Sequence, residues 1–219
     1  MAATEAGKPL GLRERKKRRT RLAILDSAIH LFWLQGYEAT TITQIAETVE
    51  VAPSTVFKYF PSKVEMVFSM LDAIIESARV TLLERPAGVS ATDAMILWIE
   101  KVVADVEAPY TGTMREIPTI VASSAELQNE QRLRVARIED VFAEAFAADT
   151  GTSPESVEAR VLASIALWGT TEIWNDWHRQ HADDQSLDMH ELCHLKAEYL
   201  RKALPAGLAA IRLLPPALD

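Results

Sequence analysis

The residues with the most recognisable catalytic chemistry are those of the sequence HELCH, residues 190–194. On a helix this spacing places His190 and His194 on one face, where two imidazoles can hold zinc while Glu191 activates water. A zinc peptidase also needs a third ligand, and no GxxH sequence follows here. We therefore predict that the chain is not an enzyme and has no cofactor. The remote alternatives are a metal-dependent hydrolase through these three residues and a non-catalytic metal site of His190, His194 and Glu198.

A second kind of chemistry is the binding of a polyanion. The run RERKKRRTR, residues 13–21, contains seven basic residues and one acidic residue. Residues 1–63 carry a net charge of +4, whereas residues 64–219 carry −12. This asymmetry indicates a polyanionic partner at the amino-terminal end only. The alternative interpretation is a solvated basic tail that favours solubility.

The stretch from Thr20 is predicted to form two helices joined by a turn. Apolar residues recur at steps of three and four from Leu22 to Phe32, and Gly36 suits the left-handed position past a helix end. Thr41 and Gln44 have the spacing of a capping box. A second, short helix should therefore begin at this point.

Two further helices are expected to start at a proline and at a serine. Pro53 suits the first turn of a short third helix, STVFKYF. Ser62 and Glu65 have capping spacing, and the apolar stripe after them predicts a long fourth helix. Two short helices joined by a brief turn make a helix-turn-helix, whose second short helix enters the major groove of DNA.

The DNA contacts follow from the side chains that this short helix does not need for its own packing, which uses Val56 and Phe60. Polar groups on the other positions are expected to contact bases, and basic or hydroxyl groups near helix amino ends to contact phosphate. Arginines of the basic run would add charge along the backbone or reach a minor groove. The predicted DNA-binding residues are Arg18, Arg19, Thr43, Ser54, Thr55, Lys58, Tyr59 and Lys63.

The same region resembles the amino-terminal domain of the TetR/AcrR transcriptional regulators. The resemblance covers about residues 15–65 and rests on LF…GY.ATT and on I…IAE..EVAPSTVFKYFPSK, together with the lysine that opens the fourth helix. The family usually has Gly where this chain has Glu50, and Tyr is common where Phe57 stands. The resemblance implies a homodimer, a palindromic double-stranded DNA operator and an all-α carboxy-terminal domain that binds a small-molecule effector and dimerises.

The predicted fold class is all-α, because glycine is scarce, Ala, Leu, Glu and Arg are common, and no strand-like alternation follows residue 84. The expected divisions are a disordered tail 1–12, a three-helix helix-turn-helix domain 13–63, a helical body 64–204 and a flexible tail 205–219. Helices of the body are expected from Ser90 to about Glu107, from about Thr113 with a break near Pro118, over Ala125–Ala148, from Ser153 to about Arg179, and over Met189–Ala203.

The effector site is predicted within the body, whose sequence loosely resembles the branch of the family that senses acyl-CoA or lipid-like molecules. Glu172 and Asn175 stand in an otherwise apolar helix, where a buried polar group needs a partner such as a ligand. Arg115, Arg132 and Arg134 could bind the phosphates of an acyl-CoA, or form a solvated face. The candidate ligand-binding residues are Trp98, Val102, Met114, Val121, Ile138, Phe142, Trp168, Glu172 and Asn175, although each Trp also suits plain core.

The last two long helices are expected, from the resemblance, to form a four-helix bundle with those of a second chain. The candidate interface residues are Leu162, Ala166, Gly169, Ile173, Leu192, Leu195 and Tyr199, and the alternative is that they pack within one chain. A single cysteine and the lack of an apolar run of membrane length predict a cytoplasmic location. The sequence thus predicts a ligand-responsive repressor, released from its operator by a small apolar or acyl-type ligand; an activator or a co-repressor-dependent regulator is the alternative.

Overall fold

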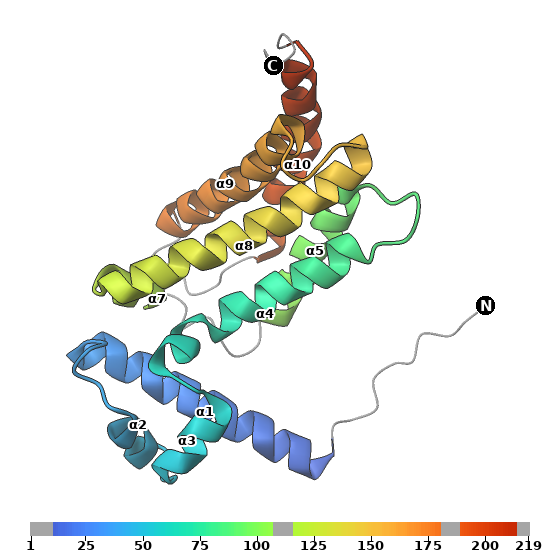
Figure 1. Ribbon diagram of the computed structural model, residues 1–219. Coiled ribbons are helices and arrows are strands. Elements are labelled where there is room, and N and C mark those ends of the chain that lie inside the picture. The colour runs from blue at the N-terminus through green and yellow to red at the C-terminus, as the bar shows by residue number, and fades with distance from the viewer. Residues whose placement is uncertain (1–10, 107–115, 181–188, 214–219) are drawn as a thin grey trace. The chain divides into compact units, whose positions relative to one another are not determined.

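A computed structural model describes residues 11–106, 116–180 and 189–213, and within these ranges all regular structure is helical. The all-α prediction is therefore confirmed (Figure 1). The helices are α1 (Leu12–Gln35), α2 (Ile42–Thr48), α3 (Pro53–Tyr59), α4 (Lys63–Leu83), α5 (Ala91–Val106), α7 (Ile117–Ala122), α8 (Ala125–Thr150), α9 (Val157–Gln180) and α10 (Met189–Ile211). None of the described helices is long and apolar enough to cross a membrane.

The chain divides into two compact units. Unit 1 comprises Met1–Ser69 and Gly112–Asn129, and unit 2 comprises Met70–Thr111 and Glu130–Asp219. Unit 1 thus contains more than the helix-turn-helix expected over 13–63, because α7 packs against α1. A hydrogen bond of 3.2 Å from Ser124 Oγ to Glu38 Oε1 also joins the two segments of unit 1.

The first helix begins earlier than expected. The apolar stripe alone predicted a start near Thr20, but α1 starts at Leu12 and includes the whole basic run. Arginine, lysine and leucine have high helix propensity, so the run extends the helix without any apolar face of its own. The basic groups consequently project from a helix.

The capping predictions of unit 1 are confirmed. Thr41 and Gln44 form a complete capping box, in which the Gln44 amide donates to Thr41 Oγ1 at 3.3 Å and the Thr41 amide to Gln44 Oε1 at 2.8 Å. Pro53 is the first residue of α3. The Glu65 amide donates to Ser62 Oγ at 3.2 Å at the start of α4.

Three helix boundaries of the later chain differ from the prediction. Pro118 lies in the first turn of α7, where a missing N–H costs no hydrogen bond, so a helix begins beside it; the expected start near Thr113 lies outside the described residues. The cap of α9 is Ser156, whose Oγ accepts from the Ala159 amide at 3.2 Å, whereas Ser153 caps a preceding turn.

The third difference is at the carboxy-terminal end, where α10 continues through Pro205 to Ile211 instead of becoming a flexible tail. Pro205 removes one backbone hydrogen bond. Leu204 and Ile211 are nevertheless 3% and 9% exposed, and Gly207 approaches Ile165 so closely that a Cβ there would lie 2.4 Å from its Cδ1. Burial of this last stretch against α9 offsets the lost hydrogen bond.

Most of the residues expected at a dimer interface instead pack within one chain. Leu162, Ala166 and Leu192 are at most 3% exposed in the core of unit 2. A Cβ on Gly169 would lie 2.0 Å from the hydroxyl of Tyr199, which itself donates to the Ile165 carbonyl at 3.0 Å. The small residue therefore admits the tyrosine between α9 and α10. Ile173 also packs against this core, and only Leu195 of the expected set is exposed, at 39%.

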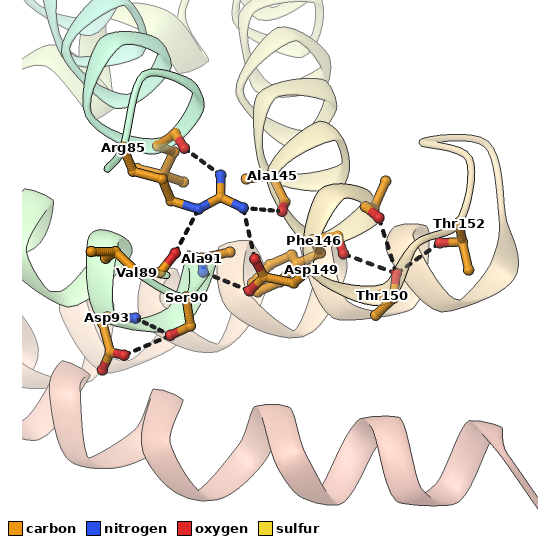
Figure 2. Close-up of polar contacts among 12 residues, drawn as sticks. Arg85, Val89, Ser90, Ala91, Asp93, Ala145, Phe146, Asp149, Thr150 and Thr152 are labelled. Atoms are coloured by element: carbon orange, nitrogen blue, oxygen red, sulfur yellow. Dashed lines mark hydrogen bonds and ion pairs between the residues drawn. The ribbon is translucent and has the colours of Figure 1, made fainter. Parts of the chain in front are cut away.

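One end of unit 2 is fixed by Arg85, which follows α4 (Figure 2). Its guanidinium donates to the carbonyls of Leu82 at 2.5 Å and Ala145 at 3.1 Å, and to Asp149 Oδ1 at 2.7 Å. The other oxygen of Asp149 accepts from the amide of Ala91, the first residue of α5, at 2.6 Å. A single ion pair therefore satisfies backbone groups at the ends of α4, α5 and α8. Ser90 and Asp93 cap α5 beside it, as predicted.

Candidate nucleic-acid interface

The seven-residue helix α3 divides into four rows of residues spaced four apart. Pro53 with Phe57, and Ser54 with Lys58, are exposed. Thr55 and Tyr59 are half-buried, whereas Val56 and Phe60 are buried, as predicted. The outward face thus consists of the first two rows.

Two of the expected base-contacting residues are therefore less accessible than the sequence indicated. Thr55 and Tyr59 lie at the edge of the outward face, while Ser54 and Lys58 lie on it. The large side chain that sequence reasoning missed is Phe57, which is 52% exposed. The spacing could have indicated this exposure, because Phe57 stands four residues after Pro53, the first residue of the helix, and therefore shares its row.

The packing of α3 connects it to the basic helix. The guanidinium of Arg21, the last residue of the basic run, lies 4.6 Å from the centroid of the Phe60 ring. The preceding basic residues from Arg13 to Arg19 are exposed. A cation over an aromatic face stabilises by about 0.5–1 kcal/mol at accessible sites. The contact fixes α1 against the end of α3 and leaves Arg18 and Arg19 in solvent.

Lys63 has a structural role that the sequence did not reveal. Its Nζ donates to the Tyr37 carbonyl at 2.7 Å and to the Thr40 carbonyl at 3.0 Å, and lies 4.4 Å from the centroid of the Tyr37 ring. The lysine, which is the first residue of α4, therefore supplies hydrogen-bond donors to carbonyl groups of the α1–α2 turn. The expected contact of Lys63 with phosphate would have to share an ammonium group that already has these partners.

The turn between α2 and α3 contains a left-handed residue that is not glycine. Glu50 has φ 54°, and its amide donates to the Glu47 carbonyl at 3.2 Å. A residue with a Cβ pays a conformational cost in this region that glycine does not. The turn therefore keeps the geometry for which glycine is the usual choice. Thr43, in the first turn of α2, is exposed.

The comparisons with known proteins agree on this region. Residues 24–70 match the family described as "Bacterial regulatory proteins, tetR family". The chain is 49% identical over 85 residues to the HTH-type transcriptional regulator TcmR of Streptomyces glaucescens, which is 39% of this chain and 38% of that protein. It is 29% identical over 169 residues to the HTH-type transcriptional repressor KstR of Rhodococcus jostii, covering 76% of this chain and 77% of KstR.

Residues 24–70 therefore form an amino-terminal helix-turn-helix domain of the TetR family.

Solved structures of the family extend the similarity of the fold beyond α4. The structure of the transcriptional regulator FadR of Bacillus subtilis, in complex with stearoyl-CoA, has a TM-score of 0.56 at 18% identity. The similarity covers 82% of this chain and 96% of that one. At this identity the comparison shows the fold only.

The residues expected to line an effector site are divided between different environments. Trp98, Ile138 and Phe142 are buried together in the core of unit 2, and Val102 packs against that core. Val121 is buried in unit 1, and Met114 lies outside the described residues. Trp168 is 52% exposed on α9, so it is not part of the core.

The polar residues chosen for the effector site are not buried. Glu172 and Asn175 are exposed and contact each other at 3.5 Å, because α9 keeps one solvent-facing side that its apolar sequence did not reveal. Arg134 is 5% exposed but donates to Asp72 at 3.0 Å and to Glu130 at 2.5 Å. It is therefore unavailable to a phosphate. Arg132 is exposed, and Arg115 lies outside the described residues.

A buried polar group and a half-buried lysine of unit 2 are more informative. The Trp98 ring packs edge-on against Phe142 with centroids 5.8 Å apart, and its indole Nε1 is buried without a hydrogen-bond partner among the described residues. Lys196, on α10, has its Nζ 5.0 Å from the centroid of the Trp174 ring. Burial lowers the pKa of Lys196 to about 8, against a weaker opposing effect of Cys193. Sequence reasoning missed this lysine, although it stands four residues after Leu192.

The histidine motif has no metal-site geometry within the described residues. In that part of the chain no group of three metal-type side chains comes together. Glu198 accepts from Lys202 Nζ at 2.5 Å, and the side chain of His190 lies outside the description. His194 is exposed. The relatives that match the chain are named transcriptional regulators and not enzymes.

Proposed function

We propose that this chain is a dimeric transcriptional repressor that reads a palindromic operator through α3 and is released by a small apolar or acyl-type effector. The observation that carries the proposal is the outward face of α3, where Ser54, Phe57 and Lys58 are exposed. The basic helix α1 contacts the end of α3 through Arg21, which packs over the ring of Phe60. A folded helix-turn-helix needs none of these side chains for its core. They are available to a major groove.

A dimer follows from the small size of the reading surface. A seven-residue helix reaches only a few base pairs, so specificity requires two copies on half-sites about 34 Å apart or at a multiple of that distance. The residues we now assign to the dimer face are the exposed apolar side chains Trp168 and Leu195, at 52% and 39%. They replace the buried residues Leu162, Ala166 and Leu192.

The DNA contacts are proposed in two groups. Ser54 and Lys58 contact bases from the outward face of α3, and Thr55 and Tyr59 assist from its edge. Arg18, Arg19 and Thr43 contact phosphate, since each is exposed on a helix of unit 1. Lys63 acts on DNA chiefly by fixing the turn between α1 and α2.

The effector is proposed to bind in unit 2. KstR is named a repressor, and FadR was solved with stearoyl-CoA, so an acyl chain is the first class to test. The apolar core around Phe142 suits such a chain, and the buried N–H of Trp98 needs an acceptor, which an ester or thioester carbonyl would supply. Lys196 would attract an anionic group.

Coupling between effector and DNA is proposed to pass along α4. Its residues up to Ser69 belong to unit 1 and those from Met70 to unit 2. An effector can weaken DNA binding only as far as it binds the two forms of the protein with different affinity. A shift of α4 that changes the separation of the two α3 helices would provide that difference.

The test is selection of bound duplexes from a random library at two salt concentrations. A repressor of this kind enriches a palindromic site and binds it more weakly at the higher salt. Binding without preference for any sequence at both salt concentrations would contradict the proposal.

The enriched duplex then serves to test the effector. Stearoyl-CoA, a short acyl-CoA and free coenzyme A are titrated into the protein–DNA complex, and DNA release is followed by fluorescence anisotropy. Release by an acyl-CoA but not by coenzyme A, weakened in Trp98→Phe, is the expected result. Tighter DNA binding on addition of the ligand would instead favour a co-repressor-dependent regulator, and stimulated transcription in vitro would favour an activator.

A further inference from the structure

One of the large exposed side chains of α3 is apolar. Phe57 is 52% exposed, although the neighbouring Val56 and Phe60 are at most 1% exposed. The core of unit 1 therefore has apolar positions on α3 already filled, and Phe57 is not among them. Its ring projects from the same face as Ser54 and Lys58, which we assign to base contacts.

The chemistry of the ring limits what Phe57 can contact on DNA. A phenylalanine side chain has no donor or acceptor, so it cannot bond a phosphate oxygen or the polar edge of a base. The one apolar group on the floor of the major groove is the C5-methyl of thymine, and apolar side chains including Phe recognise it. Contact removes both surfaces from water, which is favourable in proportion to their area.

The position of Phe57 on the helix also favours a base over the backbone. Pro53, in the same row, is at the amino-terminal end of α3, and Phe57 is one turn further along it. Its row adjoins that of Ser54 and Lys58 on one side and the buried row of Val56 and Phe60 on the other. The ring is therefore exposed next to the base-contacting residues, whereas Thr55 and Tyr59 are half-buried.

We propose that Phe57 is a specificity-determining residue that recognises the methyl group of one thymine in each operator half-site. This inference rests on the proposed function, because it needs α3 to enter the major groove. It adds a contact that distinguishes thymine from cytosine and from uracil. Lys58 and Ser54 then read the polar edges of neighbouring bases.

The experiment removes the methyl group and nothing else. Each thymine of the selected operator is replaced in turn by deoxyuridine, in both half-sites at once, and the Kd is measured for wild type and for Phe57→Ala. Burial of one methyl group corresponds to about fourfold in affinity, so two half-sites give about 15-fold. Wild type should lose this factor at one thymine position, and Phe57→Ala should bind the thymine and deoxyuridine operators equally.

Two variants serve as controls. Trp33→Ala removes a side chain of α1 with a matching exposure of 51% and should leave the thymine-to-deoxyuridine ratio unchanged. Phe57→Leu keeps an apolar side chain and should keep a smaller preference for thymine. Circular dichroism should give the same folded signal for all variants, since both mutated side chains are exposed.

The outcomes separate this inference from the proposed function. If wild type selects no site at all, both fail. If it selects a palindrome but no thymine is sensitive to loss of its methyl group, or if Phe57→Ala keeps the sensitivity, the role of Phe57 is wrong while the regulator stands.

Discussion

The helix-turn-helix of unit 1 and the helices of unit 2 are stabilised by contacts of different range. In the helix-turn-helix the caps join residues three positions apart, as Thr41 and Gln44 do. In unit 2 the polar contacts join distant segments, such as Arg134 with Asp72 at 62 positions and Tyr199 with Ile165 at 34. Local contacts specify the helix-turn-helix, here called the head, independently of its surroundings. Unit 2, here called the body, depends on how its helices pack against one another.

The largest expected effect is on the body and comes from Arg134. This guanidinium is 5% exposed and donates to both oxygens of Asp72, at 3.0 and 3.3 Å. Arg134→Leu should lower the free energy of unfolding by about 3 kcal/mol, because it removes the buried cation that donates to both oxygens of a partly buried carboxylate. Urea denaturation followed by circular dichroism measures the change.

A neighbouring arginine provides the control for that prediction. Arg137 lies 3.8 Å from the same Asp72 but its side chain is 61% exposed, so Arg137→Leu should cost less than about 0.5 kcal/mol. Equal losses in the two variants would mean that the long-range ion pair does not stabilise the body.

The next effect tests a long-range polar contact of the helix-turn-helix, that of Lys63. Lys63→Met removes donors from the carbonyls of Tyr37 and Thr40 and should destabilise the protein by about 2 kcal/mol, as hydrogen bonds to charged groups do. Lys58→Met, on the outward face of α3, should leave stability unchanged. Thermal denaturation compares the two variants. If Lys63→Met melts like wild type but lowers the salt dependence of DNA binding, the lysine is a phosphate contact and not an anchor.

A pH-dependent effect separates the two regions further. Burial lowers the pKa of Lys196 to about 8, below the ordinary value of 10.5, so between these values the unfolded chain binds more protons than the folded one. Stability gained from this group therefore rises with pH through that window. At pH 7 the buried charge costs stability, and Lys196→Met should be more stable than wild type by about 1–2 kcal/mol.

The difference between Lys196→Met and wild type should shrink as the pH rises from 8 to 10. Urea denaturation at pH 7, 8.5 and 10 measures it, with Lys202→Met as the control, since Lys202 is exposed. A difference that is constant with pH would show that the ammonium is solvated.

The smallest expected effect is in the turn of the head. Glu50 has φ 54°, a conformation that glycine adopts without a steric cost, so Glu50→Gly should stabilise the protein by about 0.5–1 kcal/mol. Glu47→Gly, three residues earlier inside α2, should instead destabilise it by about 1 kcal/mol. Chemical denaturation of both variants measures these changes in the free energy of unfolding. A loss of stability in Glu50→Gly would mean that the glutamate side chain makes a contact that outweighs its backbone cost.

The sequence predicted the head well because its signals are local. Capping pairs and Pro53 each act within a few residues, and each is found where the spacing placed it. The accessibility of side chains was not predicted correctly there. Tyr59, which is polar, is half-buried, whereas Phe57, which is apolar, is exposed. The start of α1 was predicted too late in the chain, because the basic run favours a helix but has no apolar stripe to give a periodic signal.

Prediction was poorer for the body because apolar helices look alike from sequence. Leu162 and Leu192 were indistinguishable from surface residues of a dimer until their partners within the chain were known. Glu172 seemed buried because its neighbours are apolar, although α9 has a solvent-facing side. The pairing of Arg134 with Asp72 depends on the approach of two helices, which no local pattern encodes.

If the outward face of α3 reads DNA sequence, Lys58→Ala should lose the preference for the operator and not only affinity for DNA. The affinities of wild type and variant are measured by fluorescence anisotropy for the selected palindrome and for a random duplex of equal length. The ratio of the two affinities should fall at least tenfold, since loss of one base contact in each half-site typically costs about 1–3 kcal/mol. An equal loss of affinity for both duplexes would contradict this expectation and would reduce Lys58 to a general contact with the DNA backbone.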